Sequence, residues 1–465
     1  MTYLTLLLLT ALFVYKYREK SLYAVFVVSY TQNFIVPFLF THGYVSKEVA
    51  RALVLAKDFL LLELFVWSLV VLVKRLHRPL PRPLLPLALL TAYCVFRFGV
   101  GVALFDDDLI SGLYKLKIIV FPLEILVVVM TLTALKPDFG RRFLRDITYI
   151  LSALAVVAIV LAFWAPADFW VENANVAELQ TDVKGNSDIG MYLDQGLPAN
   201  ATMTSGREML MSFLSFRASG TFGEGIALAF SMSLPVLLLS LYFSKNIISV
   251  LALSATSSAL LFSLTRSAWI FCVFVAIYVL IRRGRYSLLA IVGGTIVTLL
   301  LFCPPLNEFV GNTITHIAPS SNNPDSEHAE GILWFYARGF SDLRNILGKG
   351  MRDEVQEIPE SGYAYLLEHF GLVAYLSFLW FCFSLYWQFR KDSAEGNEAL
   401  MTVAQGIALG ILIIMHFSQY PFSMPSFMSL WYVVGLCLGG SVLPNKGLPS
   451  SPVVLSNPPL SLQPV

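Results

Sequence analysis

Charged residues are scarce in this chain. Of its 465 residues only 14% are Asp, Glu, Lys or Arg, and the mean hydropathy is +0.69. A soluble domain carries about 25% charged residues, so the scarcity excludes that class and indicates a polytopic membrane protein. The formal net charge is only +1. Because nucleic-acid-binding domains carry a strong basic excess, we expect no nucleic-acid partner.

Cysteine is also rare, and neither cysteine nor histidine shows the spacing of a metal site. The cysteines lie in or at the ends of apolar stretches, which favours buried small hydrophobic residues over disulfides. They are Cys94, Cys272, Cys303, Cys382 and Cys437. The histidines at 316, 328, 369 and 416 lack the spacing of zinc ligands. We therefore predict no metal and no cofactor.

Long apolar runs dominate the sequence. A spanning helix needs roughly 20 apolar residues, so the runs predict an all-α membrane bundle of about 12–14 transmembrane helices. They fall at 2–15, 21–40, 49–73, 84–104, 113–134, 146–165, 223–243, 247–264, 267–281, 287–303, 362–389, 399–416 and 425–441. Residues 1–15 lack a basic leader segment, and we expect a first membrane helix there instead of a cleaved signal peptide.

Basic clusters alternate with the runs in a way that sets the orientation. They lie at 16–20, 74–82, 136–145, 282–285 and 390–391, whereas 106–108 is acidic. The positive-inside rule places the basic clusters in the cytoplasm and the N-terminus outside. The chain then divides into an N-terminal bundle (1–165), a first outer loop (166–222), central helices (223–303), a second outer loop (304–361), C-terminal helices (362–441) and a disordered cytoplasmic tail (442–465).

Each predicted outer loop contains a stretch with helical hydrophobic spacing. In 207–217 the apolar residues recur as they do on one face of a helix, and 326–347 behaves similarly until Gly348-Lys349-Gly350 ends it. We expect short amphipathic helices that lie on the membrane surface.

Arg266 is the first candidate functional residue. It stands between two apolar runs with no loop between them, so it lies in a tight turn or inside the membrane boundary. An unpaired arginine at mid-bilayer costs at least about 2.5–3.5 kcal/mol, so Arg266 needs a partner. A lipid phosphate suits a fixed cation at a membrane edge.

Two further arginines are predicted on the same outer face, Arg217 just before a span and Arg338 in the second loop. A guanidinium binds phosphate oxygens in a bidentate fork and stays charged at any relevant pH. Arg217 and Arg338 are also typical of interface anchors, whose charged ends reach the membrane surface. Both interpretations stand at this point.

Glu360 is the candidate general base. It precedes the outer end of a span, and a carboxylate at such an apolar boundary is suited to accept a proton. The alternative is a solvated residue in an acidic stretch with Glu354 and Glu357.

Further charged residues lie inside the third to fifth runs. They face the interior of a bundle, where they line a polar pathway or form inter-helix ion pairs. They are Arg51, Lys57, Asp58, Glu63, Arg97, Lys115, Lys117 and Glu124.

Four segments resemble, in order, motifs of the O-antigen polymerase and ligase family. Residues 217–222, Arg-Ala-Ser-Gly-Thr-Phe, resemble the family's R-x-x-G-t-F motif. Residues 264–269 resemble its l-t-x-S-R-g-a turn, with Thr265 where serine is usual. Trp334, Arg338 and 348–350 resemble its w…plfG-v-G stretch, and 360–372 resemble H-N-x-y-L…e-x-G-l. The resemblance covers roughly residues 210–390.

The resemblance implies glycosyl transfer at the outer face of a bacterial cytoplasmic (inner) membrane. The implied donor is a glycan on undecaprenyl pyrophosphate, with no nucleotide sugar and no metal, and the implied partners are membrane lipid, a flippase and a chain-length regulator. Arg217, Arg266 and Arg338 would bind the substrate, and Glu360 would accept the proton. Glu360 replaces the histidine of the ligases, which favours a polymerase of surface polysaccharide.

Two alternatives remain open from the sequence. One is a ligase that transfers finished glycan to a lipid or protein acceptor. The other is a transporter of an anion or of the lipid-linked glycan, which the charged residues inside the spans favour. The two long outer loops and the lack of an internal repeat weigh against it.

Overall fold

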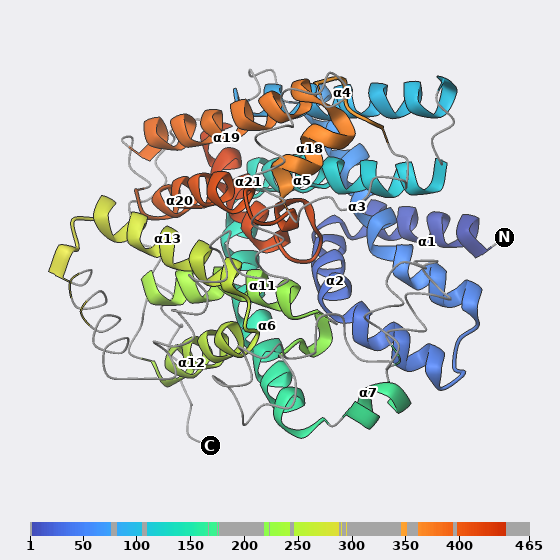
Figure 1. Ribbon diagram of the computed structural model, residues 1–465, viewed down its shortest axis with the longest axis horizontal. Helices are drawn as coiled ribbons and strands as arrows, with labels where there is room; N and C mark the ends of the chain where they lie inside the picture. The colour runs from blue at the N-terminus through green and yellow to red at the C-terminus, as the bar shows by residue number, and fades with distance from the viewer. Residues whose placement is uncertain are drawn as a thin grey trace, which may run out of the picture.

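The computed structural model describes residues 2–75, 81–104, 109–165, 167–173, 175, 218–222, 224–241, 246–287, 290, 294, 346–350, 361–393 and 398–442. In these ranges the chain is helical and contains no β-strand (Figure 1). Five helices in the described ranges are long and apolar enough to cross a membrane, and five shorter apolar helices accompany them. The predicted all-helical membrane fold is confirmed at this level.

The N-terminal helices follow the predicted apolar runs closely. They are α1 (Thr2–Lys16), α2 (Arg18–Thr41), α3 (Lys47–Arg75), α4 (Leu84–Leu104), α5 (Leu109–Leu135), α6 (Pro137–Trp164) and the short α7 (Ala167–Asn173). The largest shift is at α6, which begins at Pro137 and not at 146. Proline suits the first helical turn because its fixed φ is helical and its missing N–H would have no partner there. The predicted acidic turn at 106–108 lies outside the described residues.

The C-terminal half adds further antiparallel helices. They are η3 (Gly220–Phe222), α11 (Gly225–Leu241), α12 (Ile247–Phe262), α13 (Arg266–Arg282), α18 (Gly362–Phe370), α19 (Leu372–Ser393), α20 (Glu398–Ile414), η4 (Tyr420–Phe422) and α21 (Met428–Val442). The predicted run 287–303 lies outside the described residues except at 287, 290 and 294. The interiors of both predicted loops and residues 443–465 of the tail also lie outside them.

One predicted span is wrong. The run 362–389 forms two helices, α18 and α19, which are separated at Gly371. Gly371 has φ +86°, and a Cβ there would lie 2.6 Å from the carbonyl oxygen of Ile346. Hydropathy cannot register this break, because the residues on both sides are equally apolar.

The predicted basic clusters lie together at one end of the bundle, which we call the basic end. Lys136, between α5 and α6, forms an ion pair with Glu19 at the start of α2. The guanidinium of Arg18 lies over the ring of Trp67 of α3, 4.9 Å from its centroid. Three hydrogen bonds tie the later helices to this end: Tyr278 to Gln405 at 2.9 Å, Cys437 to the Leu400 oxygen at 3.8 Å, and Tyr432 to the Gly140 oxygen at 2.9 Å.

Helix α21 lies near the middle of the bundle and runs beside α5 (Figure 1). Glycines allow this close approach: a Cβ at Gly435 would lie 2.9 Å from Cβ of Val129, and one at Gly439 would lie 2.9 Å from Cβ of Thr133. In a membrane, where apolar burial gives little driving force between helices, small residues at such contacts stabilise packing. The end of the bundle opposite the basic end contains the turn between α12 and α13, and we call it the turn end.

Candidate functional site at the turn end

The turn between α12 and α13 is as tight as the sequence predicts. Only Ser263, Leu264 and Thr265 separate the helices, and Arg266 is the first residue of α13. Leu264 has φ +52°, a left-handed conformation that is unfavourable for a leucine, yet its side chain is fully buried. Trp269 reinforces the turn by donating from Nε1 to the Leu260 oxygen at 2.8 Å. The buried side chain of Leu264 keeps its backbone in this strained conformation. The rigid turn therefore fixes the position of the half-buried Arg266.

The chain that leaves the first long loop lies against this turn. The backbone N–H of Ala218 donates to the Phe262 oxygen at 3.0 Å. Thr221 donates to the Tyr30 oxygen at 2.8 Å, and the side chain of Asn33 donates to the Phe222 oxygen at 2.7 Å. Arg217 itself lies outside the described residues. Its neighbour Ala218 is nevertheless fixed beside the turn that carries Arg266.

Helices α11 and α13 begin next to one another. The hydroxyl of Thr265 donates to the carbonyl oxygen of Gly225 at 3.4 Å, which joins the residue before α13 to the first residue of α11. Both helices run from here towards the basic end. The positive ends of two helix dipoles therefore lie beside Arg266, and such ends stabilise anions.

A carboxylate meets a phenol at the same place. The hydroxyl of Tyr420, in η4, donates to Oε1 of Glu224, one residue before α11, at 2.5 Å. The sequence analysis assigned neither residue a role. Glu224 does carry a signal, since it is a lone carboxylate between two glycines directly before an apolar run. Tyr420 carries none, because it falls between two predicted spans.

The start of α18 lies on the segment that leads to η4. Ser361 is the N-cap of α18: its Oγ accepts from Ala364 N at 3.3 Å and donates to the Met415 oxygen at 3.1 Å. Tyr363 N donates to the same oxygen at 3.2 Å. Glu360 lies outside the described residues, immediately before this fixed serine.

The last residues before 351 are docked onto the far end of α18. Ile346 and Leu347 are helical and Gly348 has φ +81°, whereas the rest of the predicted stretch 326–347, including Arg338, lies outside the described residues. Lys349 pairs with Glu368 at 2.9 Å, and Nδ1 of His369 lies 2.8 Å from the Gly350 oxygen. Arg97 of α4 donates to the Gly348 oxygen at 2.9 Å.

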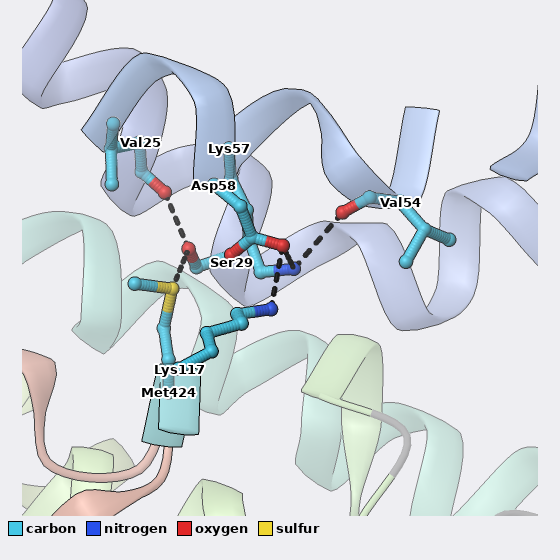
Figure 2. A network of polar contacts seen from close by, with 7 residues as sticks. All are labelled: Val25, Ser29, Val54, Lys57, Asp58, Lys117 and Met424. Atoms are coloured by element: carbon cyan, nitrogen blue, oxygen red, sulfur yellow. Dashed lines mark hydrogen bonds and ion pairs between the residues drawn. The ribbon is translucent and has the colours of Figure 1, made fainter. Parts of the chain in front are cut away.

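A charged cluster lies between α2, α3 and α5 (Figure 2). Asp58 accepts from Lys117 of α5 at 2.6 Å and lies 3.7 Å from Nζ of Lys57. Figure 2 also shows Ser29 of α2 pointing to Met424, with its hydroxyl 3.3 Å from the sulfur. The inter-helix ion pair, one of the two interpretations of the charges in these spans, is confirmed for Asp58 and Lys117.

Two other residues among the predicted intramembrane charges, Glu63 and Lys115, lie at contacts with other helices. Glu63 of α3 accepts from Thr10 of α1 at 2.8 Å. The carbonyl oxygen of Lys115 accepts from the Tyr365 hydroxyl at 3.5 Å, which places the start of α5 beside α18. In the described part of the chain, no group of three or more His, Cys, Asp or Glu side chains is arranged to hold a metal.

No protein-family model, no curated protein and no solved structure matches this chain. The site is therefore interpreted from its own geometry, together with the motif resemblance given above.

Proposed function

We propose that this protein is a metal-independent membrane glycosyltransferase that polymerises glycan repeat units carried on undecaprenyl pyrophosphate. The observation that carries the proposal is the gathering of three sequence-distant segments at the turn end. Ala218, which follows Arg217, is bonded to the last residue of α12, beside the turn that leads into Arg266. Ser361, which follows Glu360, is bonded to Met415, and the segment that follows Met415 reaches Glu224 through Tyr420.

The donor's pyrophosphate suits the electrostatics of the turn. Arg266 supplies a permanent charge and a bidentate fork, and the starts of α11 and α13 add the positive ends of two helix dipoles. A lipid-linked pyrophosphate lies at the membrane boundary, with its prenyl chain along apolar helices. Arg217, and Arg338 from the second loop, complete the clamp in this proposal.

The proposed reaction needs one proton acceptor. A hydroxyl oxygen of the acceptor sugar attacks the anomeric carbon of the donor while the bond from that carbon to the pyrophosphate oxygen breaks. The bonding electron pair leaves with the pyrophosphate, and the arginines stabilise its charge. Glu360 accepts the hydroxyl proton.

The two ends of the bundle suit the proposed orientation. Basic clusters gather at one end, as expected of a cytoplasmic face, and the candidate site lies at the other. In the proposal the turn end, including 166–222 and 304–361, faces outward from the inner membrane of a bacterium.

The test is reconstitution with the natural substrate class. The purified protein in lipid nanodiscs is given undecaprenyl-pyrophosphate-linked repeat units extracted from a source strain that lacks this gene. We expect a ladder of longer products in the absence of divalent metal. Transfer of finished glycan to a lipid or protein acceptor without a ladder would favour a ligase. No transfer in either assay would overturn the proposal.

A transporter is the second candidate, and one observation favours it. Asp58 binds two lysines within the helices, and buried ion clusters often line transport pathways. Liposomes that contain the protein would then move inorganic anions or lipid-linked glycan across the bilayer. Under the glycosyltransferase proposal we expect no such flux above protein-free liposomes.

A further inference from the structure

Two groups of backbone segments make up the turn end. The first, which we call the donor half, contains 218–222, 224, 225 and the last turn of α12 with the α12–α13 turn, joined by the hydrogen bonds of Ala218 and Thr265. The second, which we call the acceptor half, contains 415–422 and the start of α18, joined by the hydrogen bonds of Ser361 and Tyr363. Under the proposed function, the donor half carries the arginines and the acceptor half carries Glu360.

One hydrogen bond connects the two halves directly. It runs from the Tyr420 hydroxyl to the Glu224 carboxylate at 2.5 Å. Hydrogen bonds to a carboxylate are shorter and stronger than those between neutral groups, so this contact restrains both chains.

Both partners of this bond stand on fixed backbone. The oxygen of Glu224 accepts from Leu228 N at 3.2 Å in the first turn of α11. The ring of Tyr420 stacks on Phe230 with centroids 6.0 Å apart and planes at 24°. Tyr420 N also donates to Ser418 Oγ at 3.2 Å. The bond therefore joins two rigid elements.

We infer that Glu224 and Tyr420 are positioning residues that set the separation of the donor half from the acceptor half. The inference rests on the proposed function. In-line attack needs the acceptor oxygen about 3–3.5 Å from the anomeric carbon, and a misplacement of about 1 Å can cost about 100-fold in rate. A fixed bond between the half that holds the pyrophosphate and the half that holds the proton acceptor meets this requirement.

The inference assigns the role to the hydrogen bond between Tyr420 and Glu224. Glu224→Gln keeps an oxygen that accepts from Tyr420, whereas Glu224→Ala and Tyr420→Phe each remove the bond. We expect Glu224→Ala and Tyr420→Phe to lower kcat by about 10–100-fold while KM for the lipid-linked donor stays within about threefold. Glu224→Gln should stay within about threefold of the wild-type kcat.

The double variant tests whether the two residues act as one unit. Residues joined by a hydrogen bond show coupled effects, so Glu224→Ala combined with Tyr420→Phe should be no slower than the worse single variant. Multiplied effects would overturn the inference. So would a Glu224→Gln variant as slow as Glu224→Ala, because the carboxylate charge would then be the required property.

A distance measurement separates this inference from the proposed function. Spin labels at Leu261 in the donor half and Phe417 in the acceptor half, 44% and 51% exposed, report the separation without any substrate. The background carries Cys303→Ala, and the other four cysteines are buried. We expect a narrow distance distribution in the wild type and in Glu224→Gln, and a broader one in Tyr420→Phe.

The matched control is Tyr278→Phe, which removes a tyrosine hydrogen bond at the basic end. It should leave the distribution between the labels unchanged. A distribution that stays narrow in Tyr420→Phe overturns the link itself. The proposed function is overturned instead if the distance distribution broadens in Tyr420→Phe as expected but the wild-type protein makes no polymer.

Discussion

The backbone N–H of Ala218 donates a hydrogen bond to the carbonyl oxygen of Phe262 at 3.0 Å. This contact joins the end of the first long predicted loop to the turn that leads into Arg266, although the two segments are far apart in sequence. It places the chain position that follows Arg217 beside the start of α13. The pyrophosphate clamp of the proposed function needs this proximity.

Replacing Arg266 by lysine separates charge from geometry. Lysine keeps the positive charge but not the planar fork, so we expect Arg266→Lys to lose most polymerisation while expression and membrane insertion stay normal. Product length from lipid-linked repeat units is the measurement. Near-normal polymer would show that Arg266 anchors the turn without gripping the donor.

Glu360 should be required for turnover and not for donor binding. Glu360→Gln removes proton acceptance with little change of shape, so we expect the rate to fall by about 10²–10⁴-fold. Binding of undecaprenyl pyrophosphate should stay at the wild-type level because the arginines are intact. Glu360→His restores the residue that the ligases carry and should retain part of the activity. Full turnover by Glu360→Gln would remove Glu360 from the mechanism.

The two ends of the bundle should face opposite sides of the membrane. Single cysteines at Phe417, at the turn end, and at Tyr286, just beyond α13 at the basic end, are both exposed positions. In intact cells a membrane-impermeant thiol reagent should label Phe417→Cys, and Tyr286→Cys should react only after permeabilisation. Labelling of both in intact cells, or of Tyr286→Cys alone, would contradict the proposed orientation.

The Asp58 cluster should respond unequally to the loss of its members. Asp58→Asn removes the carboxylate that Lys57 and Lys117 share, and breaking a buried pair costs about 3–5 kcal/mol. Lys117→Met should cost less, about 1 kcal/mol, because Lys117 is 39% exposed and Asp58 keeps Lys57. Apparent Tm in detergent should therefore fall further for Asp58→Asn. The double variant should recover part of that loss, and equal losses in the two single variants would contradict the arrangement.

Substitutions of Gly348 and Gly284 test whether residues 346–350 pack against α18, with Gly284 as the control. Both have positive φ, +81° and +65°, but a Cβ at Gly348 would lie 2.7 Å from the backbone of Phe370, whereas one at Gly284 meets nothing within 4 Å. Gly284→Ala should cost about 1–2 kcal/mol, the price of the left-handed conformation alone. Gly348→Ala should lower the apparent Tm further, since backbone atoms cannot move aside. Equal losses would show that 346–350 does not pack against α18 as described.

Hydropathy predicted most helices because a membrane span is a local property. About twenty apolar residues in succession must form a helix in lipid, whatever their neighbours are. The bounds of α4, α13 and α20 accordingly lie within a residue or two of their predicted runs. The break at Gly371 was missed because its cause, a backbone approach by Ile346, comes from a distant part of the chain.

The candidate site divides in the same way. The sequence by itself determined that Arg266 lies in a tight turn or inside the membrane boundary, because only Thr265 and Arg266 separate the two apolar runs. It left the role of Asp58 open, because the residue could line a polar pathway or form an inter-helix ion pair. Only the tertiary structure decided that Asp58 pairs with Lys117 of another helix and that Glu224 meets Tyr420. Which side chains meet across a bundle depends on the rotation and depth of each helix, and these are set by packing between helices and not by the order of residues within one.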